Sequence, residues 1–290
     1  CGVAGCSGPT GREGGTTIIV GTSILGAGGI GKSEDGAAII TRRSYNTGAT
    51  TVNNGTLRLG TGAGPHALLV APTATVPTLA DLNVNAGFFD LNGNTQAVRQ
   101  VTQGTQNTYA NSAGTIQNSN AATATLITSP NAAATFSGVI TGGNINLEKQ
   151  GGSNWTLLSA SNLGSGSLTV RGAQLILRES GSITTTGTIT VPFGQLILDN
   201  SGLGVVNPSR IGSSAVSLTG GTLSFLAADG PDSQTLGALT VNAGANVVNN
   251  SVFAAGSASG STSVLPRASL TRGSAVQATL NFTGGGGTLG

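Results

Sequence analysis

Residues that could act as catalytic bases or nucleophiles are few and isolated in this sequence. The 290 residues contain one histidine, His66, and two cysteines, Cys1 and Cys6. A nucleophile or general base needs an oriented partner within hydrogen-bonding reach, and only Gly, Ala and Pro surround His66 in residues 62–67. We therefore predict that His66 lies in an exposed loop and that the chain has no catalytic residues and is not an enzyme. Two cysteines and one histidine also predict no metal site.

Acidic residues come close together in the sequence only at Glu34-Asp35 and at Asp229-x-x-Asp232. Clustered acids could bind calcium, or could supply the general acid and base that cleave a polysaccharide. The second group lies in residues 227–233, whose composition is typical of a turn, so we expect a turn there. Acids brought together from distant parts of the chain stay an alternative.

One segment matches the phosphate-binding loop in full, as Gly26-x4-Gly31-Lys32-Ser33. That loop works only between a buried parallel strand and a helix. Residues 34–40 lead instead into a β-type pattern, and a chain with 48 glycines matches such a motif easily by chance. We therefore expect no nucleotide and no other cofactor.

Side chains suited to surface ligands are also scarce. The aromatic residues considered for stacking on sugars are Trp155, Tyr45 and Tyr109. Trp155 and Leu157 are two residues apart and share a strand face, which favours core packing for Trp155. Alternating threonines occur at Thr184, Thr186, Thr188 and Thr190. They would share one strand face, but no matching Thr-x-Thr rows recur at the repeat spacing, so we expect a solvated face rather than an ice-binding one.

Composition limits the class of protein that these side chains belong to. The chain has 12 basic and 10 acidic residues, no Met, and 38% hydrophobic residues. This content does not fit a disordered chain, and the glycines lack the period of collagen. We predict no transmembrane helix, because no apolar run is long enough to cross a bilayer. A net charge of +2 makes nucleic acid an unsuitable partner. What remains is a β-rich chain built from repeats.

One repeat consists of an apolar residue, a glycine three places on, and apolar residues five and seven places on. It reads Val52-Asn53-Asn54-Gly55-Thr56-Leu57-Arg58-Leu59 in its first copy. Alternate residues face the same side of a strand, so Leu57 and Leu59 should face inward, and Thr56 and Arg58 outward. The predicted core positions are Val52, Leu57, Leu59, Val84, Phe89, Leu91, Val170, Leu175, Leu177, Val191, Leu196, Leu198, Leu218, Leu223 and Phe225.

The spacing of the repeats favours coils over hairpins. The first apolar residues of successive copies are Val170, Val191, Leu218, Val241 and Leu270. Their intervals, roughly 20–30 residues each, are those of a solenoid repeat, since a sandwich would show turns every ~8–12 residues. We predict an all-β, single-stranded parallel β-helix of about a dozen coils, in which each coil buries its apolar side against its neighbours.

The domain organisation predicted is an N-terminal segment, 1–15, followed by a continuous solenoid, 16–290, within a longer chain. The first segment carries Cys1 and Cys6. Three states stay open for these cysteines: a local Cys1–Cys6 disulfide or two free thiols, a lipidated Cys1, and an intermolecular disulfide.

A longer unit also occurs twice. Its first copy runs from Gly31 to Leu57 and its second from Phe136 to Val170. The spans from Lys32 to Val52 and from Lys149 to Val170 have nearly the same length, with the only two lysines at matching places. In each copy, the lysine is followed by a glycine-rich step, alternating apolar residues and a Thr-Val end. This unit resembles the autotransporter-associated β-strand repeat of bacterial surface proteins. The resemblance implies a right-handed parallel β-helix that is exported and displayed outside the cell, without catalytic residues.

The sequence therefore predicts an extracellular structural β-solenoid, a rod or filament-forming segment of the cell surface with a scaffold or adhesive role. Open ends of a solenoid expose strand edges, so copies are expected to associate end to end unless a longer parent chain continues the stack. Two alternatives stay open. One is a β-helical enzyme acting on polysaccharides, and the other is an adhesin that binds surface glycans.

Overall fold

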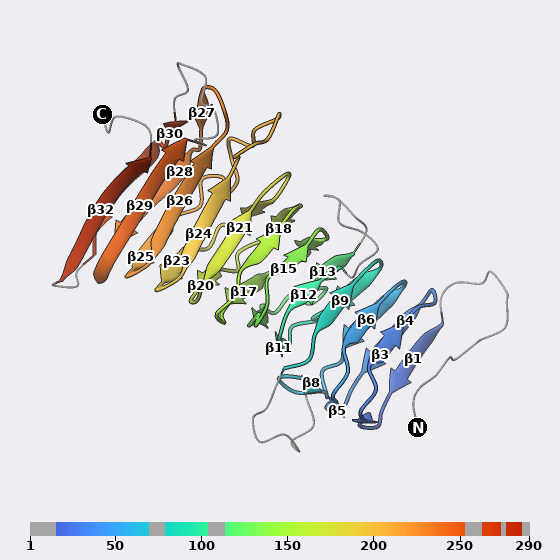
Figure 1. The fold of residues 1–290 in the computed structure, drawn as a ribbon. Helices are drawn as coiled ribbons and strands as arrows, with labels where there is room; N and C mark the ends of the chain where they lie inside the picture. The colour runs from blue at the N-terminus through green and yellow to red at the C-terminus, as the bar shows by residue number, and fades with distance from the viewer. Residues whose placement is uncertain (1–15, 70–78, 104–113, 253–262, 274–276, 286–290) are drawn as a thin grey trace.

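The protein is described by a computed structural model for residues 16–69, 79–103, 114–252, 263–273 and 277–285. These residues form strands, turns and loops and contain no helix. The strands stack one after another from the N-terminal to the C-terminal end, and the sheets follow one another along the stack (Figure 1). All pairings between named strands are parallel, as expected for a β-solenoid.

The strands fall on three sides, which the chain visits in turn. The first side contains β1 (Thr17–Val20), β4 (Ala37–Ile40), β7 (Thr56–Leu59), β10 (Phe88–Asp90), β13 (Thr115–Gln117) and β16 (Val139–Thr141), followed by the pair β19 (Ala160–Asn162) and β22 (Ser182–Thr184) and the pair β27 (Asp232–Ser233) and β30 (Ser263–Val264).

The second side begins with β2 (Leu25–Gly26), β5 (Ser44–Asn46) and β8 (Leu68–Leu69). It continues as β11 (Thr95–Val98), β14 (Ala124–Thr128), β17 (Ile145–Lys149), β20 (Leu168–Val170), β23 (Ile189–Pro192), β25 (Val216–Thr219), β28 (Leu236–Val241) and β31 (Arg267–Arg272).

The third side begins with β3 (Ile30–Lys32), β6 (Thr50–Val52), β9 (Leu82–Val84) and β12 (Val101–Thr102). It continues as β15 (Ala134–Phe136), β18 (Trp155–Leu157), β21 (Gln174–Leu177), β24 (Gln195–Asp199), β26 (Thr222–Ala227), β29 (Gly244–Val252) and β32 (Ala278–Gly285). The parallel β-helix predicted from the sequence is confirmed, while its handedness and its number of coils stay predictions.

The core runs along the inside of this stack. Each of the fifteen apolar positions named above is at most 2% exposed, and the polar neighbours Thr56 and Arg58 are only half-buried. No coil could bury these side chains alone, so the apolar rows hold successive coils together by removing apolar surface from water.

Strand register explains the two long repeats. Lys32 is the direct neighbour of Val52 in the β3–β6 pair, and Lys149 is the direct neighbour of Val170 in the β17–β20 pair. The repeat length is therefore the length of one coil. The two copies lie on different sides, however, since the first belongs to the third side and the second to the second side.

One predicted register is wrong at the C-terminal end. Val191, Leu218 and Val241 are direct neighbours in successive coils, as expected. Val241 then pairs with Arg272, whereas Leu270 pairs with Leu239. Side chains on one strand face repeat every two residues, so a shift of two residues keeps Leu270 on the same face, and the alternation alone does not select the register.

Candidate functional site

His66 lies in a loop, as predicted, but it is half-buried, so the exposure predicted for it is wrong. Its backbone N–H donates to the carbonyl of Thr95, and its Nδ1 accepts a hydrogen bond of 3.0 Å from the N–H of Ala97. A left-handed backbone at His66, with φ 56°, turns the ring toward β11 of the next coil. The ring nitrogen of His66 thus accepts the hydrogen bond of the Ala97 N–H, as a backbone carbonyl of the neighbouring coil would do in a regular strand pair.

The acidic groups singled out in the sequence take part in turns. Asp229 is exposed, and Asp232 is 5% exposed. The Asp232 carboxylate accepts hydrogen bonds from Asn200 Nδ2 at 3.0 Å and from the N–H of Ala228 at 2.9 Å, which closes the turn before β27. Asp35 accepts a hydrogen bond from Asn54 in the next coil. Within the ranges that the structure describes, no three His, Cys, Asp or Glu side chains gather as a metal site.

The segment that matches a phosphate loop forms β2 and β3, and no helix follows it. Lys32 points into the solenoid, where its Nζ donates to the carbonyl of Glu34 and, at 3.3 Å, to that of Asn54. Burial lowers the pKa of Lys32, against the opposite influence of Glu34 and Asp35. The ammonium group therefore binds backbone carbonyl oxygens at a strand corner.

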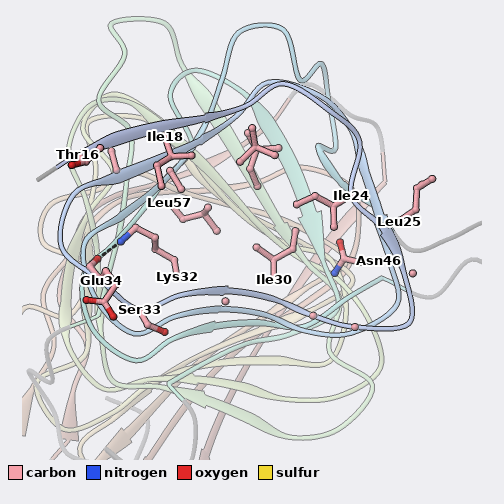
Figure 2. A pocket seen from close by; sticks show the side chains of 18 of the residues that line it. Thr16, Ile18, Ile24, Leu25, Ile30, Lys32, Ser33, Glu34, Asn46 and Leu57 are labelled. Carbon is pink, nitrogen blue, oxygen red and sulfur yellow. Dashed lines mark hydrogen bonds between the residues drawn. The ribbon is translucent and has the colours of Figure 1, made fainter. Parts of the chain in front are cut away.

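A cavity of about 510 Å³ opens at the first coils (Figure 2). Ile18, Ile24 and Ile30 form part of its apolar wall, and Lys32 and Asn46 lie on its polar parts. It is the interior of the solenoid at this end, lined by residues 16–57.

Lys149 repeats the arrangement of Lys32 in a more buried setting. Its side chain is fully buried, and its Nζ donates to the carbonyl oxygens of Gly172 at 2.6 Å and Gly151 at 3.4 Å. Of the ion pairs among the described residues, none includes Lys149. Burial lowers its pKa to about 8, because water is replaced there by apolar side chains.

Sequence reasoning missed a buried polar network around Arg210. This side chain is fully buried, and it donates to Asn200 Oδ1 at 2.6 and 2.9 Å and to the carbonyl of Gly181 at 2.6 Å. Asn200 in turn donates to Asp232, and burial lowers the pKa of Arg210 to about 10. The network links three successive coils where a loop replaces a strand of the first side, and no spacing in the sequence signals it.

Of the aromatic residues considered for sugar stacking, Trp155 and Tyr45 are not exposed. Trp155 is fully buried, and its Nε1 donates to the carbonyl of Val101 at 3.1 Å, as its predicted core role requires. Tyr45 is half-buried, and Tyr109 lies outside the described residues. The most exposed aromatic among the described residues is Phe193, which is 80% exposed between β23 and β24.

Phe193 occupies a corner that is normally made by a small residue. In five successive coils, the corner between the second and third sides has one left-handed residue, and these residues are Gly151, Ala173, Phe193, Gly220 and Gly244. A φ of 62° at a bulky residue such as Phe193 costs about 1–3 kcal/mol. The glycine of the sequence repeat, Gly194, has a different role, because a Cβ there would lie 2.6 Å from the carbonyl oxygen of Val170.

The four alternating threonines do not share a strand, so that prediction is wrong. Thr184 ends β22 and Thr190 lies in β23, with a bend at residues 186–187. The structure instead places a row of hydroxyl side chains along the outer face of the second side. The members of the row are Thr169, Thr190, Ser217, Thr240 and Thr271, each the direct neighbour of the next.

The fold defines the class of this chain as a parallel β-solenoid. No protein-family model matches it, and neither a curated protein nor a solved structure shows significant similarity to it. A helix able to span a membrane is absent from the part of the chain that the structure describes. Cys1 and Cys6 lie outside that part.

Proposed function

We propose that this chain is a rod-forming structural segment of an extracellular protein, displayed on a bacterial cell surface. The observation that carries the proposal is the unbroken parallel pairing from β11 to β31 on the second side and from β15 to β32 on the third. Buried apolar rows follow both sheets as far as β28 and β29. Such a stack forms a long, stiff rod, because each coil packs against its neighbours.

The state of the carboxylates supports a structural role over a polysaccharide-acting enzyme. General acid and base catalysis needs two carboxyl groups that face one substrate. The carboxylates of Asp81, Asp90, Glu148 and Asp199 each form an ion pair with an arginine. Asp90, for example, is fully buried and also accepts hydrogen bonds from Ser119 and from the N–H of Asn92.

Location and shape are tested separately. Antibodies raised against this chain should label intact cells, and labelling that appears only after permeabilisation would contradict the surface location. Small-angle scattering of the purified chain should show an elongated particle. Its length should correspond to ~4.8 Å for each coil of the stack. A compact particle of the same mass would contradict the rod.

We also propose that the terminal coils are covered in the assembled protein, either by a second copy or by further chain. Ile19 and Leu25 at the β1 end are 68% and 67% exposed, and Leu270 and Phe282 at the other end are 43% and 38% exposed. Exposed strand edges with apolar side chains favour pairing with another chain. Light scattering at rising concentration should show growing mass for the chain alone, and a constant monomer mass would contradict association between copies.

A further inference from the structure

Phe193 occupies a corner where the fold does not need a phenylalanine. The neighbouring coils make the same corner with Gly220 and Gly244, whose φ is 77° at both positions. A glycine would adopt this backbone without strain. The phenylalanine is therefore not explained by the turn.

The side chain of Phe193 also contributes little to packing. It is 80% exposed, and its ring lies over Gly220 of the next coil, where an added Cβ would approach Cε1 to 3.0 Å. The Cδ1–Cε1 edge of the ring thus lies against Gly220, and most of the side chain faces solvent. An unburied aromatic in a strained conformation points to a binding role rather than to folding.

Strand register places hydrogen-bonding groups on the outer face of the second side, near the corner at Phe193. Thr190, three residues before Phe193, belongs to the outer hydroxyl row described above. In the preceding coils, Arg171 forms an ion pair with Glu148, which also accepts a hydrogen bond of 2.8 Å from Gln150. The Arg171 side chain is 56% exposed, so its remaining N–H groups are available to a ligand.

This combination suits a neutral, polyhydroxylated ligand. An aromatic face attracts the weakly positive C–H groups of a sugar ring, and the hydroxyl, guanidinium and amide groups can bind its hydroxyls. Because Arg171 and Glu148 neutralise one another, this pair adds no net charge that would attract a polyanion. The coil spacing of ~4.8 Å is close to the length of one residue in an extended β-linked glycan.

We propose that Phe193 is the stacking platform of a site for a neutral glycan that lies along the outer face of the second side, with Thr190 and Arg171 bonded to its hydroxyls. This site is independent of the rod-forming role. A rod could form without it, and glycan binding could occur without end-to-end association.

Affinity electrophoresis of the folded chain tests the site. The probes are native gels that contain hydroxyethyl cellulose, xylan, mannan or dextran, with alginate as the anionic comparison. At least one neutral polysaccharide should retard the unmodified protein. Phe193→Gly should weaken that binding roughly tenfold or more, whereas Phe193→Trp should retain it.

Two controls separate binding from folding. Asparagine also adopts the left-handed backbone readily. Phe193→Asn should therefore lose glycan binding as Phe193→Gly does, while its small-angle scattering curve stays like that of the parent. Phe88→Ala removes another exposed phenylalanine (44% exposed) from the first side and should leave binding unchanged. The proposal is overturned if no neutral polysaccharide retards the protein, if alginate alone does so, if Phe193→Gly binds as tightly as the parent, or if Phe88→Ala loses as much.

Discussion

The fully buried Lys149 makes stability depend on pH in a direction that can be measured. Its pKa is lowered from 10.5 to about 8, because burial disfavours the charged form, and none of the ion pairs found among the described residues includes it. Between these two values the unfolded chain binds more protons than the folded chain, so the free energy of unfolding rises with pH. One pKa unit corresponds to ~1.4 kcal/mol, which gives a gain of about 2 kcal/mol between pH 7 and pH 9.5.

Trp155 provides a local probe for this effect. It is the only tryptophan, it is fully buried, and it lies in β18, the strand that follows Lys149. Urea unfolding followed by its fluorescence should show the rise in stability with pH. Cys1 and Cys6 should be replaced by serine in every sample, so that thiol titration does not contribute.

Lys149→Met should remove most of the rise in stability between pH 7 and pH 9.5, since the group whose pKa is lowered to about 8 is gone. Lys32→Met is the matched control, because Lys32 lies in the first coils and should leave the transition seen by Trp155 unchanged. The reasoning would be refuted by a parent protein with constant stability from pH 7 to pH 9.5. It would also be refuted if Lys149→Met kept the slope.

Three further substitutions test the packing. Leu196→Asp should destabilise by about 4 kcal/mol or more, because Leu196 is fully buried; Thr190→Asp on the outer face is the control, and equal melting temperatures would contradict the inward assignment. Arg210→Met should cost roughly 2–5 kcal/mol in chemical denaturation, since Asn200 and the carbonyl of Gly181 lose their donor; unchanged stability would show that the network is dispensable. Gly166→Ala should destabilise the fold by about 1–3 kcal/mol in melting experiments, because the added Cβ would lie 1.9 Å from the carbonyl oxygen of Ile145. Gly152→Ala is the control and should be neutral or stabilising, because its added Cβ meets nothing within 4 Å. A larger loss of stability for Gly152→Ala than for Gly166→Ala would contradict this account.

Local features of the sequence were sufficient to predict the fold class. The two-residue alternation at Leu57 and Leu59 determines which side chains are buried, because neighbouring residues of a strand face opposite sides. The distance from Lys149 to Val170 equals one coil, since a parallel stack places equivalent positions next to each other. These are properties of backbone geometry, and they can be read without knowing how the sides are arranged.

Long-range register decided the rest. Arg210, Asn200 and Asp232 meet only because loops of different length bring three coils into line, and loop length carries no signal of which partners will meet. The exposure of Phe193 likewise depends on what the next coil presents at the same corner, which is Gly220. The local pattern therefore specifies which residues face inward, whereas only the tertiary structure determines which polar and aromatic groups lie together, because those contacts join residues from separate coils.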